Sequence, residues 1–155
     1  AKRTYDLMLA VGQKPIMMHK ETQGFILNRL QWALMAEAYR LVDDGYVGVE
    51  DLDKCLKEGL GLRWSFIGPF EVGDLNAPGG IADYSRRFGP MIYEMDSSAQ
   101  SNARKWSDEL LTKIEKERRQ YMQVADIGAR SKWRDRRLMG LMAHKRVMEK
   151  KDQSA

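Results

Sequence analysis

Residues 24–45 read GFILNRLQWALMAEAYRLVDDG and form the stretch with the clearest helical pattern in the chain. Its apolar residues recur three and four positions apart and cover well over half of a helical circumference. Thr22, shortly before it, is typical of a helix N-cap, and Gly45 is typical of a C-terminal stop. The pattern therefore predicts a long helix that other helices surround, as the central helix of a bundle.

Further helices are predicted on both sides of this stretch. They are expected over residues 2–11, from 49 or 50 to 58, over 69–75, 81–88 and 97–122, and over about 129–149. Gly59 is expected to end the second of these, so that residues 59–70 (GLGLRWSFIGPF) form an apolar loop. Gly89-Pro90 is expected to end the 81–88 helix. The fold class predicted is all-α.

A short apolar run, residues 16–18, is the exception to the helical pattern. Pro15 precedes it and charge bounds it, so it is expected to be a brief strand or an extended connector. A lone strand near residue 16 has no strand in this sequence to pair with. We therefore expect it to be left over from a larger structure.

The composition bounds the class of protein. The 155 residues are 43% hydrophobic and 31% charged, as in a soluble globular domain. No apolar run approaches the roughly 18 to 20 residues of a membrane span. The opening AKRTYDLML carries no secretory signal pattern, and the single Cys55 fits a reducing compartment. We expect a cytoplasmic protein without a membrane partner.

Few residues are suited to hold a metal or a nucleotide cofactor. His19, His144 and Cys55 are far apart in sequence, so no metal site is predicted. The nearest approach to a dinucleotide fingerprint is GLGLRW at 59–64, where Trp64 replaces the glycine that packs a helix on a strand. No cofactor-binding residue is predicted in this chain, and a cofactor domain would lie elsewhere.

Charge is distributed unevenly. Residues 1–100 carry 11 Lys and Arg against 14 Asp and Glu, whereas residues 101–155 carry 15 against 8. The tract 133–146 (WRDRRLMGLMAHKR) invites a nucleic-acid hypothesis, with Trp133 available to stack on a base. Carboxylates in and around the tract weaken that hypothesis: Asp126, Asp135 and Glu149. A solvated or oligomer-interface helix is favoured, and no nucleic-acid partner is predicted.

Two polar residues are candidates for chemistry. Asn28 lies early in the otherwise apolar 24–45 helix, where a carboxamide either bonds a nearby backbone group or cap, or orients a substrate oxygen. Arg63 stands between glycines and among Leu62, Trp64 and Phe66, where its planar fork could bind a carboxylate. The alternative for Arg63 is a solvated side chain or an ion pair with a nearby glutamate, Glu58 or Glu71.

The ordered motifs GFILNRL, AEAYRLVDDG, DLDKCLKEGLGLRWSFIGPFE and DLN resemble the C-terminal domain of the 3-hydroxyacyl-CoA dehydrogenase superfamily. The resemblance covers roughly residues 12–95. GLGLRWSFIGPFE and the later WRDRRL are most similar to the lambda-crystallin branch, which includes L-gulonate 3-dehydrogenase. The resemblance implies a helical bundle around a long central helix, like the C-terminal domain of 6-phosphogluconate dehydrogenase.

The resemblance also implies that the chain contains parts of two domains with different functions. Residues 1–20 would end a Rossmann domain that binds NAD and carries the catalytic histidine, and residues 21–155 would be the substrate-binding and dimerisation domain. Asn28 would be the family's active-site asparagine in GF-x-x-N-R, and Arg63 would hold a substrate carboxylate. Neither His19 nor His144 matches the catalytic histidine.

The reaction implied is NAD-linked oxidation of a hydroxyl group beta to a carboxylate, with a small hydroxy acid as substrate and a homodimer as the assembly. Two alternatives remain beside it. The substrate could be a 3-hydroxyacyl-CoA of fatty acid oxidation, or the domain could be a non-catalytic, crystallin-like dimer module.

Overall fold

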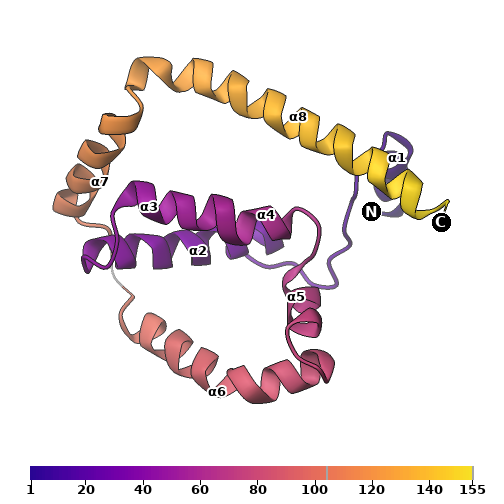
Figure 1. Cartoon of the computed structure of the whole chain (residues 1–155), viewed down its shortest axis with the longest axis horizontal. Coiled ribbons are helices and arrows are strands. Elements are labelled where there is room, and N and C mark those ends of the chain that lie inside the picture. The colour runs from indigo at the N-terminus through magenta and orange to yellow at the C-terminus, as the bar shows by residue number, and fades with distance from the viewer. Residues whose placement is uncertain (104, 155) are drawn as a thin grey trace. The chain divides into compact units, whose positions relative to one another are not determined.

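The computed structural model describes residues 1–103 and 105–154, and every regular element in them is helical (Figure 1). The predicted all-α class is confirmed. The chain forms two units, residues 1–40 and 41–155, with the division inside its first long helix.

The first unit begins with α1 (Lys2–Ala10). Gly12 ends this helix with a φ of 77°, and Gln13 N–H donates to the carbonyl of Met8 at 2.9 Å. This is the left-handed C-terminal motif that glycine favours. Residues 13–18 have no regular structure, so residues 16–18 form a connector, one of the two predicted alternatives, and not the brief strand. A strand requires a hydrogen-bonded neighbour, and no strand exists among the described residues.

Helix α2 (Phe25–Asp43) begins at a sharp turn rather than at a side-chain cap. Gly24 and Phe25 both have positive φ angles, 78° and 51°. Thr22 contributes its backbone carbonyl, which accepts the Phe25 N–H at 3.1 Å. A Cβ atom on Gly24 would stand 2.9 Å from the ring of Trp32. Glycine is therefore required here both by the backbone conformation and by the ring that packs over it.

The packing around α2 differs from the prediction of an enclosed central helix. Most of its large apolar side chains are exposed in this chain, among them Phe25, Ile26, Leu27, Leu30 and Trp32. Leu27 is 74% exposed, whereas Val42 near the C-terminal end is 3% exposed. The sequence pattern identifies which faces are apolar, but it does not specify what covers them.

The second unit contains a helical stretch that the sequence did not predict to be continuous. α3 (Val49–Lys54) runs through a wide π-helical segment, η1 (Cys55–Leu60), into α4 (Gly61–Trp64), and Figure 1 shows them as one coil. Gly59 does not end the helix, and only residues 65–68 form the expected loop. The Gly61 N–H donates to the carbonyl of Leu56, five residues earlier. The wide turn accommodates the glycines without interrupting the helix.

Helices α5 (Pro69–Leu75) and α6 (Gly80–Ser101) pack against each other. α5 begins at Pro69, as predicted. A Cβ atom on Gly73 would collide with the side chain of Ile81, so glycine allows the two helices to approach closely. Asp74 Oδ1 accepts the Ile81 N–H at 2.7 Å and caps α6. The aspartate of the DLN motif therefore has a structural role.

The predicted break at Gly89-Pro90 is wrong, because α6 continues through Pro90 to Ser101. A proline inside a helix removes one main-chain donor and bends the axis, and a long helix tolerates that loss. The 97–122 helix is also wrong as predicted, because the chain leaves the helix after Ser101. Residue 104, within that range, lies outside the described residues.

The last elements are α7 (Asp108–Tyr121), the 3₁₀ turn η2 (Val124–Asp126) and α8 (Ile127–Asp152). Ser107 caps α7, because its hydroxyl oxygen accepts the Leu110 N–H at 3.2 Å. α8 confirms the helix predicted over about 129–149 and continues to Asp152. The signal for the α7 boundary was the sequence Ser-Asp-Glu at 107–109, a cap followed by acidic residues.

Helix α7 contacts the ends of two other helices, one through a lysine and the other through a glutamate. Lys113 Nζ donates to the Val42 carbonyl, at the C-terminal end of α2, at 2.7 Å. Glu117 Oε2 accepts the Val49 N–H, at the start of α3, at 2.9 Å. Each charge is favourable to the partial charge of the helix end that it meets. The polar face of α7 is thus a structural connector.

The buried hydrophobic core of the described residues is small. It consists of Val42, Val49, Val72, Ala77 and Leu110. None of the helices in the described part of the chain combines the length and the apolarity that a membrane crossing requires.

Candidate functional site

Asn28 lies in the first turns of α2, three residues after the strained Phe25. Its side chain is exposed, and no hydrogen bond of its amide is found among residues 1–103 and 105–154. The interpretation of Asn28 as a helix cap or a partner of a nearby backbone group is therefore not supported. Its amide is available to a group from outside these residues. A non-glycine residue at positive φ often marks a functional segment, and Phe25 is such a residue.

Arg63 lies in α4, immediately after the π-helical segment. Its side chain is exposed, and it makes no ion pair with Glu58, Glu71 or any other carboxylate in the described part of the chain. Its main-chain carbonyl accepts two hydrogen bonds, from Phe66 N–H at 3.0 Å and Ile67 N–H at 3.1 Å. The backbone under Arg63 is therefore fixed while its guanidinium keeps all its donors for an anion.

The wide turn before Arg63 requires a glycine. A Cβ atom on Gly61 would stand 2.9 Å from the carbonyl oxygen of Leu56, which accepts the Gly61 N–H. Because this oxygen belongs to the backbone, it cannot move aside without opening the turn. π-helical segments of this kind often occur at functional sites. Here the segment sets where Arg63 emerges from the helix.

Asn28 and Arg63 belong to different units of the chain. Asn28 lies within residues 1–40, and Arg63 lies within residues 41–155. Each is an exposed polar side chain on a helix, with an ordered backbone and without a side-chain partner among the described residues.

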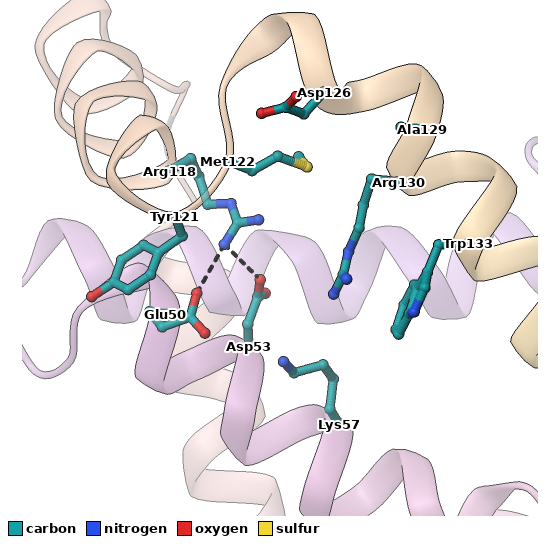
Figure 2. Close-up of a pocket in the computed structure, with 10 residues that line it drawn as sticks. All are labelled: Glu50, Asp53, Lys57, Arg118, Tyr121, Met122, Asp126, Ala129, Arg130 and Trp133. Carbon is teal, nitrogen blue, oxygen red and sulfur yellow. Dashed lines mark hydrogen bonds and ion pairs between the residues drawn. The ribbon is translucent and has the colours of Figure 1, made fainter.

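The second unit also has a cavity, of about 600 Å³, between α3, η1, α7 and α8. Figure 2 shows the ten residues that line it. They are Glu50, Asp53, Lys57, Arg118, Tyr121, Met122, Asp126, Ala129, Arg130 and Trp133. Three carboxylates and three cations share this space, so the cavity has no strong preference for either sign of charge.

Arg118 forms ion pairs with two of the carboxylates that line this cavity. One of its guanidinium nitrogens lies 3.1 Å from Glu50 Oε2 and 3.4 Å from Asp53 Oδ2 (Figure 2). The side chains of Arg118 and Glu50 are only 26% and 21% exposed, so solvent screens this pair less than a surface pair. The arrangement fastens α7 to α3. The cavity is therefore a structural junction in the second unit.

Trp133, the candidate for stacking on a base, already has cations against it. The Arg130 guanidinium carbon lies 3.7 Å from the centre of the ring, and that of Arg137 lies 5.5 Å away. These arginines precede Trp133 by three residues and follow it by four, so all three share one side of α8. Contacts within α8 therefore account for Arg137 of the basic tract and for Arg130, which lies just before the tract.

The GLGLRW segment, residues 59–64, does not have the structure of a dinucleotide fingerprint. Residues 59–64 (GLGLRW) are helical, whereas a dinucleotide fingerprint requires a tight turn between a strand and a helix. The residues that the structure describes also contain no group of three or more His, Cys, Asp or Glu suited to a metal ion. The two predicted site residues, Asn28 and Arg63, are both exposed, and neither side chain has a partner in the part of the chain that the structure describes.

The family model for the C-terminal domain of 3-hydroxyacyl-CoA dehydrogenase matches residues 24–126. The chain belongs to this family. The match includes Asn28, Arg63 and all of α2 to α7, and it confirms the resemblance found in the motifs. The family is one of dehydrogenases.

Individual relatives agree with this placement. A lambda-crystallin homolog of Homo sapiens is 38% identical over 149 residues, which are 90% of this chain and 44% of that protein. A 3-hydroxyacyl-CoA dehydrogenase of Gibberella moniliformis is 33% identical over 142 residues, again 90% of this chain and 44% of that protein. An L-carnitine dehydrogenase of Pseudomonas putida is 39% identical over 84 residues, 54% of this chain and 26% of that protein. The chain thus spans less than half the length of these family members.

The sequence did not reveal which cations of the C-terminal region make long-range contacts. Lys145, within the basic tract, donates through Nζ to the Ser65 carbonyl, two residues after Arg63. The same Nζ lies 5.7 Å from the centre of the Phe66 ring. The uneven charge was the available signal, but it does not distinguish a lysine in contact with a helix end from a solvated one.

Proposed function

We propose that this chain is the substrate-binding and dimerisation part of an NAD-dependent 3-hydroxy-acid dehydrogenase of the L-gulonate 3-dehydrogenase type. Membership of the dehydrogenase family and the similarity to lambda-crystallin homologs support it. The observation that carries it is Arg63, an exposed guanidinium without a carboxylate partner on an ordered backbone. Such a group is suited to bind the carboxylate of a free acid.

In this proposal residues 1–20 end a nucleotide-binding domain and residues 21–155 form the helical domain. The relatives above are more than twice as long as the part that this chain matches, which supports a further domain in them. The chain alone would be inactive, because NAD and the catalytic base would be held by that domain. NAD supplies the acceptor for the hydride of the substrate carbon. The single, exposed Cys55 is consistent with a cytoplasmic location.

The two candidate residues would have distinct roles. Arg63 would bind the substrate carboxylate with both arms of its fork and so select free acids, since a thioester offers it no anion. Asn28 would be the catalytic asparagine of the helical domain, with its amide donating to a substrate oxygen and orienting the hydroxyl group. Neither role requires a metal.

Dimerisation is supported by the apolar surface that this chain leaves exposed. In addition to the residues of α2 described above, α6 exposes Met91, Ile92, Tyr93 and Met95. Apolar side chains that lie exposed on a helix are suited to packing against a partner protein surface. A second copy of the protein and the nucleotide-binding domain are the partners proposed to cover them.

A 3-hydroxyacyl-CoA substrate is the second candidate. The observation in its favour is the 33% identity to the Gibberella moniliformis 3-hydroxyacyl-CoA dehydrogenase over 90% of this chain. A third candidate, a non-catalytic dimer module, is supported by the similarity to lambda-crystallin homologs. The two polar side chains without partners, Asn28 and Arg63, favour a catalytic protein over this third candidate.

The deciding experiment measures NAD-linked oxidation by the full-length protein that contains this chain, with L-gulonate and with a 3-hydroxyacyl-CoA. We expect turnover of the free acid. The Arg63→Met variant is expected to raise the KM for L-gulonate by tens of fold. This factor corresponds to the loss of about 2 kcal/mol of binding free energy from a charged bidentate pair. Arg136→Met, an exposed arginine on α8, is the matched control and should leave KM unchanged.

Turnover of the acyl-CoA alone would overturn the free-acid proposal in favour of the second candidate. An inactive but dimeric full-length protein would favour the non-catalytic module. If Arg63→Met and Arg136→Met behave alike on L-gulonate, Arg63 is not the carboxylate-binding residue.

A further inference from the structure

Lys145 connects α8 to the segment that follows Arg63. Its Nζ donates to the main-chain carbonyl of Ser65, eighty residues earlier in the chain, and the contact is partly buried. The Nζ also lies 5.7 Å from the centre of the Phe66 ring, within reach of a cation–π interaction. A single ammonium group thus contacts two successive residues beyond α4.

The segment that Lys145 contacts is the C-terminal end of α4. The Ser65 hydroxyl donates to the Gly61 carbonyl at 3.0 Å, and the N–H groups of Phe66 and Ile67 donate to the Arg63 carbonyl. Carbonyls at the end of a helix lack partners within the helix, and Lys145 supplies one to Ser65. The backbone that carries Arg63 is therefore fixed from both sides, by the π-helical turn before it and by Lys145 after it.

The end of a helix is an unfavourable place for an anion. Its unpaired carbonyls give it a partial negative charge, which repels a carboxylate that approaches Arg63. The ammonium of Lys145 is favourable to the helix end and offsets that charge. It therefore affects anion binding in two ways, by ordering the backbone of Arg63 and by raising the local electrostatic potential.

Other cations of α8 have different surroundings. Arg130 and Arg137 lie against Trp133 of the same helix, and Arg134 pairs with its neighbour Asp135 at 2.8 Å. Lys150, near the C-terminal end of α8, is exposed. Among the described residues of α8, Lys145 is the cation bonded to the main chain of a distant segment.

We propose that Lys145 is a positioning residue for carboxylate selectivity: it holds the end of α4 so that Arg63 binds the free-acid substrate. This inference rests on the proposed function, because it assumes that Arg63 binds the carboxylate. Lys145 itself touches Ser65 and Phe66 and acts on the substrate through Arg63.

The test compares three variants of the full-length protein: Lys145→Met, Lys145→Arg and, as the control on the same helix, Lys150→Met. Lys145→Met is expected to raise the KM for L-gulonate about threefold to tenfold with kcat within twofold, the size of effect that a charge at a helix end produces. Lys145→Arg, which keeps the charge and a donor, should restore most of the loss. Lys150→Met should match the unchanged protein.

A structural readout accompanies the kinetics. Hydrogen exchange of the Phe66 and Ile67 amides should accelerate in Lys145→Met and not in Lys150→Met, because these amides bond the Arg63 carbonyl next to the lost contact. If Lys145→Met lowers kcat and raises KM equally, or if its KM matches that of the control, the positioning role is wrong.

Arg63→Met separates the two proposals. If that variant raises KM while Lys145→Met does not, the carboxylate site stands and the role of Lys145 is wrong. If Arg63→Met leaves KM unchanged, the proposed function of the site fails. In that case accelerated exchange at Phe66 in Lys145→Met would demonstrate only the structural contact, and the selectivity role would fall.

Discussion

The segments that carry the two candidate residues are ordered in different ways. The Asn28 segment, residues 24–40, contains contacts between residues that are close in sequence. Gly24 packs against the Trp32 ring, and Glu37 forms an ion pair with Arg40 at 2.5 Å. The Arg63 segment, residues 49–67, is held by side chains from much later in the sequence. Glu117 caps its start at 2.9 Å, and Lys145 bonds its end.

This difference shows how the chain uses its charge. Residues 101–155 hold the excess of Lys and Arg, and three cations of this region contact helix ends or carboxylates of the earlier helices: Lys113, Arg118 and Lys145. The positive charge is therefore partly structural, since it meets negative helix ends and acidic first turns. A basic C-terminal region does not by itself indicate a nucleic-acid partner.

The largest expected effect comes from Leu110→Ala, which removes a 4% exposed side chain from the first turn of α7. Loss of a buried leucine costs about 3 kcal/mol of the free energy of unfolding. Hydrogen exchange should accelerate most over residues 49–67, because Glu117 of α7 caps α3. Leu111→Ala, at a neighbouring 41% exposed position, is the control and should have a much smaller effect. Equal effects of the two variants would contradict the role of α7.

The next effect is expected from Gly61→Ala. A methyl group there would meet the Leu56 carbonyl at 2.9 Å, so the π-helical turn must open, at a cost of about 2 kcal/mol. Gly59→Ala, in the same segment, has nothing within 4 Å and should be neutral or stabilising, because alanine favours a helix. Thermal unfolding of both variants checks this. A Gly61→Ala protein as stable as Gly59→Ala would show that the wide turn is not required.

A smaller, local effect is expected from Gly24→Ala at the other segment. Alanine at a φ of 78° costs about 1 kcal/mol, and the Trp32 ring must shift from its 2.9 Å approach. Exchange at the first turns of α2 should accelerate, and the intrinsic fluorescence of Trp32 should change. Gly128→Ala, which has open space around it, is the control. An effect spread evenly over residues 41–155 would contradict the local character of this segment.

The smallest effect is expected when the pH is lowered, because Asp83 in the first turn of α6 then becomes protonated. The hydrogen bond from Arg87 holds the pKa of Asp83 below its ordinary value of 3.8, and the Gly79 N–H adds to this. Because the pKa is depressed in the folded state, the stabilisation is present above the unfolded pKa and is lost as the pH falls through the folded value, below about pH 4. An NMR titration should give a higher pKa for Asp83 in Arg87→Met. An unchanged pKa would contradict this contact.

Much of the fold could be predicted from local patterns. The apolar periodicity of residues 24–45 predicts α2, Pro69 predicts the start of α5, and Gly12 and Gly45 mark two helix ends. Each of these signals acts within one or two helical turns, so the sequence contains all the information required. The motif set likewise identified the family without any structural information.

Two helix ends were predicted wrongly at a glycine or a proline, because these residues are compatible with more than one backbone conformation. Gly59 and Pro90 were predicted to end helices, but a π-helical turn accommodates the first and a long helix continues through the second. Both residues only bias the backbone, and the energy difference of about 1 to 3 kcal/mol is small enough for packing to decide. The prediction of one helix over 97–122 was wrong for a different reason, because the Ser107 cap that begins α7 was missed.

For the candidate site, too, some features could be predicted from the sequence and others depend on tertiary contacts. The sequence alone determined the family, the all-helical class and the two polar residues, Asn28 and Arg63, because these depend on residue type and spacing. Only the tertiary structure decided that neither side chain has a partner among the described residues, and that Lys145 bonds the end of α4. A contact between residues eighty positions apart depends on how the helices are packed, and no local pattern of the chain encodes it.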